Sequence, residues 1–302
     1  MNGTTLKNKW VLITGASSGF GAAAARAFGA QGSRLLLGAR RIDRLQTVAA
    51  EARKAGAPEA RFHALDVSLT ASVEAFIAWA RDTIGERQAA VVSSPCSVIS
   101  HQSSDTTPEP LITDHRSRIT PPVSPIPRLD VLINNAGGAH GLDTVAEGKD
   151  ADWEAMLQAN VLGVLRMTRA ALPLMLDNPG STLINIGSVA GHVAYEGGAA
   201  YCAAKAGELQ ITRALRLELN GTGIRVSTVD PGLAETEFSL VRFKGDRARA
   251  AKIYEGTQPL TAEDIADILV WIASRPPHVN IDELLVKPVD QAAIHKVYRR
   301  KA

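Results

Sequence analysis

Short apolar segments alternate with longer amphipathic segments along the chain. The apolar segments are rich in leucine, isoleucine and valine and have the length of β-strands that are buried on both faces. They lie at Trp10–Thr14, Arg34–Gly38, Arg61–Asp66, Leu129–Asn134, Thr182–Gly187, Ile224–Val229 and Glu283–Lys287. The amphipathic segments predict helices at Gly21–Ala30, Leu45–Ala55, Ser72–Ile84, Trp153–Leu176, Ala203–Asn220 and Ala262–Ser274. This alternation predicts an α/β fold in which a mostly parallel sheet of seven strands carries helices on both faces.

The candidate strands and helices form one series over residues 1–302, so we expect a single domain. Residues 92–127 interrupt this series, because they are rich in Ser, Thr and Pro and show no periodicity. Such a composition does not support a packed core, and we expect this insertion to be disordered. It can be a native surface insertion. It can also be a translated intron, since Val92-Ser93 can be encoded by GTAAGT and Pro127-Arg128 by CCCAGG.

Composition and charge exclude several classes of protein. The net charge of +2 is too small to indicate a nucleic-acid partner or a membrane surface. The two cysteines, Cys96 and Cys202, cannot form a disulfide framework or a structural zinc site, so we expect no metal. The first nine residues are polar, and no apolar stretch is long enough to span a bilayer. These features predict a cytoplasmic protein.

A glycine-rich loop follows the first predicted strand. The loop Thr14–Gly21 has the spacing Gly-x-x-x-Gly-x-Gly and opens the first predicted helix. Glycine allows a tight turn and a close approach to a pyrophosphate, which then lies at the helix N-terminus. The spacing alone could mark only a turn, but its position between strand and helix favours a dinucleotide site. The glycine-rich loop and the alternation of predicted strands and helices together predict a doubly wound Rossmann sheet with strand order 3-2-1-4-5-6-7.

Two arginines, Arg40 and Arg41, follow the second predicted strand, which ends without an acidic residue. An acid at this position accepts the ribose hydroxyls of NAD, whereas a guanidinium matches the 2′-phosphate of NADP. The two arginines could also be a solvated charge pair, but the pattern favours NADP(H) as the cofactor. Asp66 and Val67, after the third strand, are candidates for contacting the adenine, and Asp66 could also cap the next helix.

Tyr201 and Lys205 are candidates for catalysis, because residues four apart in a helix share a face. A free tyrosine has a pKa of about 10, and a neighbouring lysine cation favours the phenolate. Such a pair can exchange a proton with a hydroxyl or carbonyl group. Ser188 follows the fifth strand and Asn134–Gly137 ends the fourth, at the sheet edge where ligands bind in open α/β folds. Asn160 lies in the helix that comes next.

Together these motifs resemble the short-chain dehydrogenase/reductase family. The loop Thr14–Gly21 is similar to the family's cofactor loop, and Asn134–Gly137 is similar to its Asn-Asn-Ala-Gly stretch. Pro231-Gly232 resembles the motif after its sixth strand. The residues that match the family's catalytic tetrad, in chain order, are Asn160, Ser188, Tyr201 and Lys205. The resemblance covers the chain except for the insertion.

The resemblance implies a role for each matching residue. Tyr201 exchanges a proton with the substrate, and Ser188 hydrogen-bonds the substrate oxygen. Lys205 favours the phenolate and binds the nicotinamide ribose, and Asn160 holds a water that links Lys205 to solvent. The residues expected to contact NADP(H) are Gly15, Ser17, Ser18, Gly19, Phe20, Gly21, Arg40, Arg41, Asp66, Val67, Asn135, Ala136, Gly137, Tyr201, Lys205, Pro231, Gly232, Leu233 and Thr236.

The C-terminal third is similar to the NADP-dependent 3-hydroxy acid dehydrogenases, in Thr236–Asp246 and Pro277–Ile281. This resemblance implies reversible oxidation of serine, L-allo-threonine or 3-hydroxypropionate, and a homotetramer. A substrate carboxylate needs a cation in the cleft. Arg242 and Lys244 are candidates for this cation, although each could be a solvated surface charge. His140 and His192 lie near the expected cleft, but the implied chemistry does not require a histidine.

Two other functions stay open on the sequence. The same four catalytic residues could serve a carbonyl reductase that acts on neutral ketones and aldehydes. The chain could also be an inactive NADP(H)-binding protein, if the insertion disrupts the fold. The intact set of catalytic residues favours an enzyme.

The intron hypothesis predicts that the mature transcript lacks a segment that contains the codons for residues 92–127, because splicing would remove it. Sequencing complementary DNA from this gene measures this directly. A spliced transcript that carries these codons contradicts the hypothesis and makes the insertion native.

Overall fold

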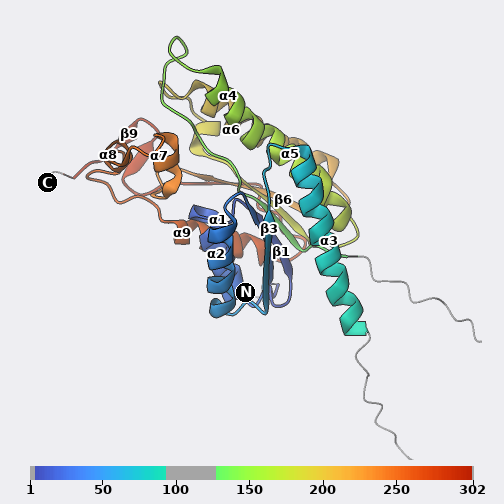
Figure 1. Cartoon of the computed structure of the whole chain (residues 1–302). Helices are drawn as coiled ribbons and strands as arrows, with labels where there is room; N and C mark the ends of the chain where they lie inside the picture. Colours follow the sequence, from blue (N-terminus) through green and yellow to red (C-terminus); the bar gives the residue numbers. More distant parts are fainter. Residues whose placement is uncertain (1–3, 93–126, 301–302) are drawn as a thin grey trace, which may run out of the picture.

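The computed structural model describes residues 4–92 and 127–300, and in this part of the chain seven strands form one parallel sheet (Figure 1). The strand order β3-β2-β1-β4-β5-β6-β7 confirms the predicted doubly wound Rossmann fold. The strands are β1 (Trp10–Thr14), β2 (Arg34–Ala39), β3 (Glu59–Ala64), β4 (Val131–Asn134), β5 (Thr182–Ile186), β6 (Arg225–Pro231) and β7 (Glu283–Val286). A short antiparallel pair, β8 (Gln291–Ala293) and β9 (Lys296–Val297), follows the sheet.

Helices cover both faces of the sheet (Figure 1). One face packs against α1 (Gly19–Ala30), α2 (Ile42–Ala55) and α9 (Ala262–Ala273). The other face packs against α3 (Thr70–Val92), α5 (Gly163–Ala171) and α6 (Ala199–Glu218). The shorter helices are α4 (Asp150–Leu157), α7 (Glu237–Arg242) and α8 (Arg247–Lys252).

Alternation of side chains along the central strands divides the core into two layers. In β1, Val11 and Ile13 belong to the layer beneath α1, α2 and α9, whereas Leu12 belongs to the layer beneath α3, α5 and α6. All three side chains are fully buried. Successive residues of a strand point to opposite faces, so a continuous apolar run is required where both faces are covered. This requirement explains the unbroken apolar segments in the sequence.

Most predicted elements differ from the observed ones at their ends, and the helix predicted at Ser72–Ile84 extends from Thr70 to Val92. Two further differences have a clear physical reason. The third strand was expected at Arg61–Asp66, but β3 pairs with β2 from Glu59 to Ala64. As an edge strand with polar side chains, it carries no continuous apolar run to mark its ends. The helix predicted at Trp153–Leu176 is interrupted by a π turn, η1 (Gln158–Leu162), and ends in a 3₁₀ turn, η2 (Leu172–Leu174). A hydrophobic pattern with a period of 3.6 residues does not show where a single turn widens.

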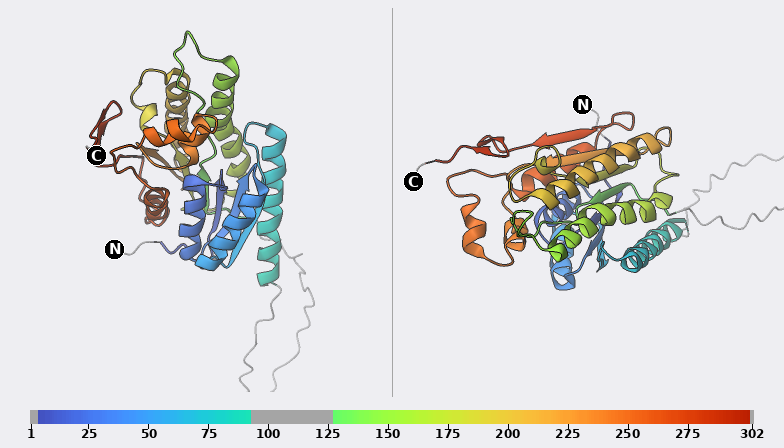
Figure 2. Two further views of the ribbon diagram at one scale, coloured as in Figure 1. Left: turned by 60° about the vertical axis from the view of Figure 1, so that its left-hand side comes forward. Right: turned by 90° about the horizontal axis from the view of Figure 1, so that it is seen from above.

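The disorder predicted for about residues 92–127 falls outside the described residues and stays a prediction. Its two points of attachment are described. Helix α3 ends at Val92, and Pro127 precedes β4 and lies beside Gly85, where an added Cβ would be 3.6 Å from the proline Cγ. Pro127 thus lies before the amino end of β4, and in Figure 2 the C-terminal end of α3 points away from α7 and α8. No helix in residues 4–92 and 127–300 is long and apolar enough to cross a membrane.

Candidate active site

A cavity of about 1160 Å³ opens at the carboxyl ends of the central strands. Its walls come from the loops after β1, β2, β3, β4, β5 and β6 and from α6 and α7. This is the edge at which open parallel sheets bind ligands, because the strand order reverses there. All of the residues expected to contact a dinucleotide line this cavity except Gly21.

The glycine loop is held in place by the end of β4. The Thr14 hydroxyl accepts hydrogen bonds from the backbone N–H groups of Asn135 and Ala136, each at 2.9 Å. The Asn135 side chain donates to the Thr14 carbonyl at 2.9 Å. A Cβ on Gly21 would lie 2.6 Å from both the Asn135 amide nitrogen and the Gly15 carbonyl oxygen. Gly21 therefore allows the first helix to approach the loop, and this packing explains its absence from the cavity wall.

Arg41, which follows β2, reaches across to the glycine loop at one end of the cavity. Its guanidinium donates to the Ser17 hydroxyl at 3.1 and 3.2 Å and to the Ser18 hydroxyl at 2.7 Å. It also pairs with Glu237 of α7 at 3.0 Å, and Arg44 pairs with the same carboxylate. Arg41 and the two hydroxyls form a cationic cradle beside the helix N-terminus, which is suited to a phosphate group.

Asp66 lines the cavity after β3, near Arg40. Its carboxylate accepts hydrogen bonds from the Ser68 backbone N–H at 3.0 Å and from the Ser68 hydroxyl at 2.6 Å. It thus stabilises the turn before α3 and does not cap that helix directly. Partial burial raises the pKa of Asp66. The hydrogen bonds from Ser68 and the charge of Arg40 lower it by more, so the pKa lies below its usual value.

The four residues of the predicted tetrad surround one end of the cavity. Ser188, Tyr201 and Lys205 line it directly. The Ser188 hydroxyl accepts a hydrogen bond from the Ala190 N–H at 3.1 Å, so it begins the 3₁₀ turn η3 (Val189–Gly191). The Tyr201 ring packs against Phe238 of α7, with 5.6 Å between the ring centroids. This arrangement brings a phenol, a hydroxyl and an ammonium group to the same wall.

Asn160 lies behind this wall, in the π turn η1, and is 1% exposed. Its amide donates to the backbone carbonyls of Met156 at 2.8 Å and Gly138 at 2.9 Å and accepts from the Gly138 N–H at 3.2 Å. A Cβ on Gly137 would lie 2.4 Å from its amide oxygen. The π turn thus fixes Asn160 against the loop that follows β4. Its expected contact with a water stays a prediction.

Lys205 is buried beneath Tyr201. Its ammonium donates to the Ile186 carbonyl at 2.7 Å and to Glu208 at 2.6 Å. Burial lowers the pKa of Lys205. The charges of Glu208, Tyr201 and Asp230 and the hydrogen bond to Glu208 raise it by more, so the pKa lies above its usual value. The lysine is therefore held in its charged form.

The two cations considered for a substrate carboxylate lie in different places. Arg242 lines the cavity, and its guanidinium lies over the rings of Tyr195, Tyr201 and Phe238 at 5.4, 5.6 and 6.0 Å. It donates to the Tyr195 hydroxyl at 2.6 Å. Lys244 pairs instead with Asp152 at 2.8 Å, on a more exposed surface.

Sequence reasoning missed several residues of the site, among them Tyr195, Glu208 and Glu237. Tyr195 contacts Arg242, Glu237 contacts Arg41, and Glu208 contacts Lys205. Burial raises the pKa of the Tyr195 phenol, although Arg242 opposes this shift. The contacts of Tyr195 with Arg242 and of Glu237 with Arg41 join residues far apart in the sequence, so no short motif indicates them. Glu208 follows Lys205 by three residues in the helix, a spacing that could have predicted their contact.

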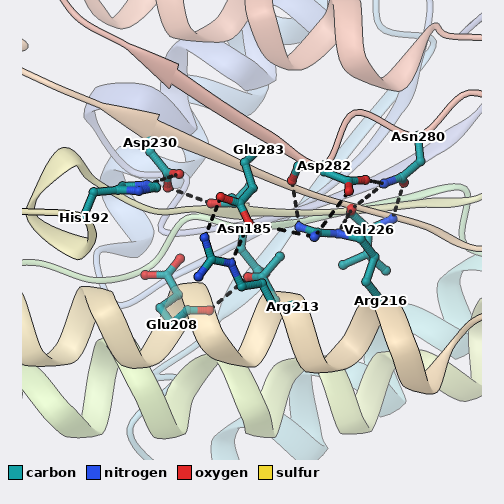
Figure 3. Close-up of polar contacts among 12 residues, drawn as sticks. Asn185, His192, Glu208, Arg213, Arg216, Val226, Asp230, Asn280, Asp282 and Glu283 are labelled. Atoms are coloured by element: carbon teal, nitrogen blue, oxygen red, sulfur yellow. Dashed lines mark hydrogen bonds and ion pairs between the residues drawn. The ribbon is translucent and has the colours of Figure 1, made fainter.

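The histidines set aside in the sequence take different positions. His140 lines the cavity. His192 does not, and its ring contacts the buried Asp230 carboxylate at 2.8 Å (Figure 3). Asp230 also accepts a hydrogen bond from the Thr228 hydroxyl at 2.8 Å. Figure 3 also shows Glu283 of the neighbouring strand β7, which pairs with Arg213 of α6 at 2.7 Å.

Comparison with known families gives a match over most of the chain. A family model described as short chain dehydrogenase matches residues 9–93 and 117–245. Residues 94–116, inside the predicted insertion, fall between the two matched parts.

Individual proteins match as well. Sulfoacetaldehyde reductase from Chromohalobacter salexigens is 38% identical over 283 residues, which cover 93% of this chain and 94% of that protein. NADP-dependent 3-hydroxy acid dehydrogenase from Schizosaccharomyces pombe is 45% identical over 174 residues, 58% of this chain and 67% of that protein. A solved structure described as the closed form of serine dehydrogenase complexed with NADP+ has a TM-score of 0.76 and 34% identity, covering 97% of this chain and 100% of that one.

Proposed function

The chain belongs to the short-chain dehydrogenase family, and we propose that it is an NADP(H)-dependent oxidoreductase acting on small 3-hydroxy acids and the corresponding aldehydes. The observation that carries this proposal is the cavity itself. It joins the glycine loop and Arg41 at one end to Ser188, Tyr201 and Lys205 at the other. A cofactor lying along the strand ends would therefore reach the residues that handle a proton.

The residues present fit NADP(H). The Arg41 guanidinium and the hydroxyls of Ser17 and Ser18 form a donor cradle where a 2′-phosphate would lie, and β2 ends without an acid. NADP(H) supplies or accepts the hydride in this chemistry. The S. pombe relative and the solved serine dehydrogenase are both named with NADP, which supports this choice.

We assign Tyr201 as the general acid and base that exchanges a proton with the substrate oxygen. The Lys205 ammonium lies below the same wall, and its positive charge stabilises the phenolate that Tyr201 forms. Ser188 donates a hydrogen bond to the substrate oxygen and holds it beside Tyr201. Asn160 fixes the loop after β4 through the Gly138 backbone and so keeps this wall in place.

The proposed substrate class follows from the cation in the cavity wall beside Tyr201. Arg242 lies within 6 Å of the Tyr201 ring, so a short acid bound there would place its hydroxyl near the tyrosine. The relatives are named for 3-hydroxy acids, serine and sulfoacetaldehyde, which are small molecules with an anionic group close to the reacting carbon. Arg242 thus supports an anionic substrate over the neutral ketones of the alternative reductase.

The insertion is attached away from this site. Pro127 precedes β4, whereas the cavity lies at the carboxyl ends of the strands, and this separation supports an active enzyme over an inactive cofactor-binding protein. We also propose a cytoplasmic location, which rests on the composition, and a homotetramer, which rests on the resemblance to the family.

A substrate panel tests the proposed reaction. With NADP+, we expect turnover of L-serine, L-allo-threonine and 3-hydroxypropionate to exceed that of a neutral secondary alcohol, measured as NADPH absorbance. Replacing Tyr201 with Phe removes the proton-exchanging group and is expected to lower kcat by about 100-fold or more. A chain without residues 93–126 serves as the control for the insertion. Equal turnover by wild type and Tyr201→Phe contradicts the assignment, and faster turnover of the neutral alcohol favours the carbonyl reductase.

Arg41→Ala tests the choice of cofactor. Loss of a charge-assisted contact of about 1.5–3 kcal/mol is expected to raise KM for NADP+ by roughly 10- to 150-fold, with little change for NAD+. Arg44→Ala is the matched control, because Arg44 pairs with Glu237 but has no described contact with Ser17 or Ser18. Equal effects of Arg41→Ala on both cofactors would exclude a role in phosphate recognition.

Arg242→Ala tests the substrate cation. Its loss is expected to raise KM for 3-hydroxypropionate by roughly 10-fold or more, and to leave KM for the neutral alcohol within about twofold. Lys244→Ala is the control, because this lysine pairs with Asp152 outside the cavity wall. A larger effect of Lys244→Ala than of Arg242→Ala would move the carboxylate site to Lys244.

A further inference from the structure

Glu208 lies one helical turn after Lys205 on α6 and is 1% exposed. Its Oε2 atom accepts a hydrogen bond from the Lys205 ammonium at 2.6 Å. Its Oε1 atom is buried and has no hydrogen-bond partner among the described residues. A buried carboxylate with one unpaired oxygen is costly, so its retention beside a buried ammonium points to a role for the pair.

The geometry fixes the position of the lysine. An ammonium group has three N–H donors. The Ile186 carbonyl, at 2.7 Å, and Glu208, at 2.6 Å, accept two of them from the side of the sheet and the helix. The third donor is left for the cavity that Lys205 lines. Without Glu208, the four-carbon side chain would keep one protein acceptor and could rotate within its buried site.

The charges around the pair also favour the ammonium. Tyr201 and Lys205 lie on α6, and Asp230 approaches from β6, where His192 contacts its carboxylate. Arg213, also on α6, is paired with Glu283 of β7 (Figure 3). Burial and the charge of Asp230 raise the pKa of Glu208, and Lys205 opposes this, for a value of about 7. The Lys205 ammonium therefore favours the charged form of Glu208, which burial and the charge of Asp230 disfavour.

We propose that Glu208 is a positioning residue, which holds the Lys205 ammonium against the cavity and keeps it charged while Tyr201 exchanges its proton. Glu208 itself touches neither substrate nor cofactor and acts only through Lys205. This inference rests on the proposed roles of Tyr201 and Lys205.

The test compares pH profiles of kcat for oxidation of 3-hydroxypropionate with saturating NADP+. In wild type, kcat is expected to rise with pH and then stay level, because Lys205 keeps its proton in the alkaline range. In Glu208→Gln, the pKa of the buried lysine falls without its anionic partner. We expect a new descending limb below about pH 10, along which kcat falls roughly tenfold per pH unit. KM for 3-hydroxypropionate should change by less than about threefold, since Glu208 does not contact it.

Two further variants keep the test decisive. Glu218→Gln makes the same substitution at an exposed position of α6 and should leave the profile unchanged. Glu208→Asp keeps the charge one methylene farther from the lysine, and its descending limb should lie at higher pH than that of Glu208→Gln. A Glu208→Gln profile parallel to wild type, or a Glu208→Asp limb at lower pH than that of Glu208→Gln, overturns the proposal. Full activity of Tyr201→Phe would instead refute the proposed chemistry on which it rests.

Discussion

A positive charge buried beneath the strand ends is the constraint around which the site is built. The Lys205 side chain is almost fully buried, where an unpaired ammonium would be costly. The surrounding structure meets this cost with the Ile186 carbonyl, the Glu208 carboxylate and the charge of Asp230. Because these groups come from β5, α6 and β6, the cation depends on the assembled sheet and on the helix packed against it.

The same strand ends bring the other parts of the site together. The Thr14 hydroxyl joins the end of β1 to the end of β4, and this contact sets the glycine loop beside the loop that carries Gly138. Asn160 binds Gly138 from the π turn. The loop after β4 is therefore hydrogen-bonded both to the glycine loop and to the π turn behind the wall that carries Tyr201. Helix α7 closes the remaining side, where Glu237 contacts Arg41 and Arg242 contacts Tyr195. One short helix thus contacts both the end of the cavity at Arg41 and the end at Tyr195.

The parts of the structure that depend on local sequence were predictable. The buried strands showed as apolar runs, and the glycine loop and the Tyr201–Lys205 spacing each lie within a few residues. The parts that depend on contacts between distant segments were not. The position of β3 is set by its pairing with β2, the π turn at Asn160 leaves no mark on the hydrophobic pattern, and the contact of Arg242 with Tyr195 joins residues 47 positions apart. Arg242 and Lys244 looked equivalent in the sequence, and only the fold places one in the cavity wall and turns the other to Asp152.

In the proposed reaction, a hydride moves between NADP(H) and the reacting carbon of a small acid inside this cavity. The most direct test supplies malonic semialdehyde with NADPH that carries deuterium on one or the other face of nicotinamide carbon 4, in separate samples. Mass spectrometry of the 3-hydroxypropionate then locates the label. We expect one deuterium at carbon 3 from one of the two labelled cofactors and none from the other. Product without deuterium from both cofactors, or no product from either, would exclude this hydride transfer.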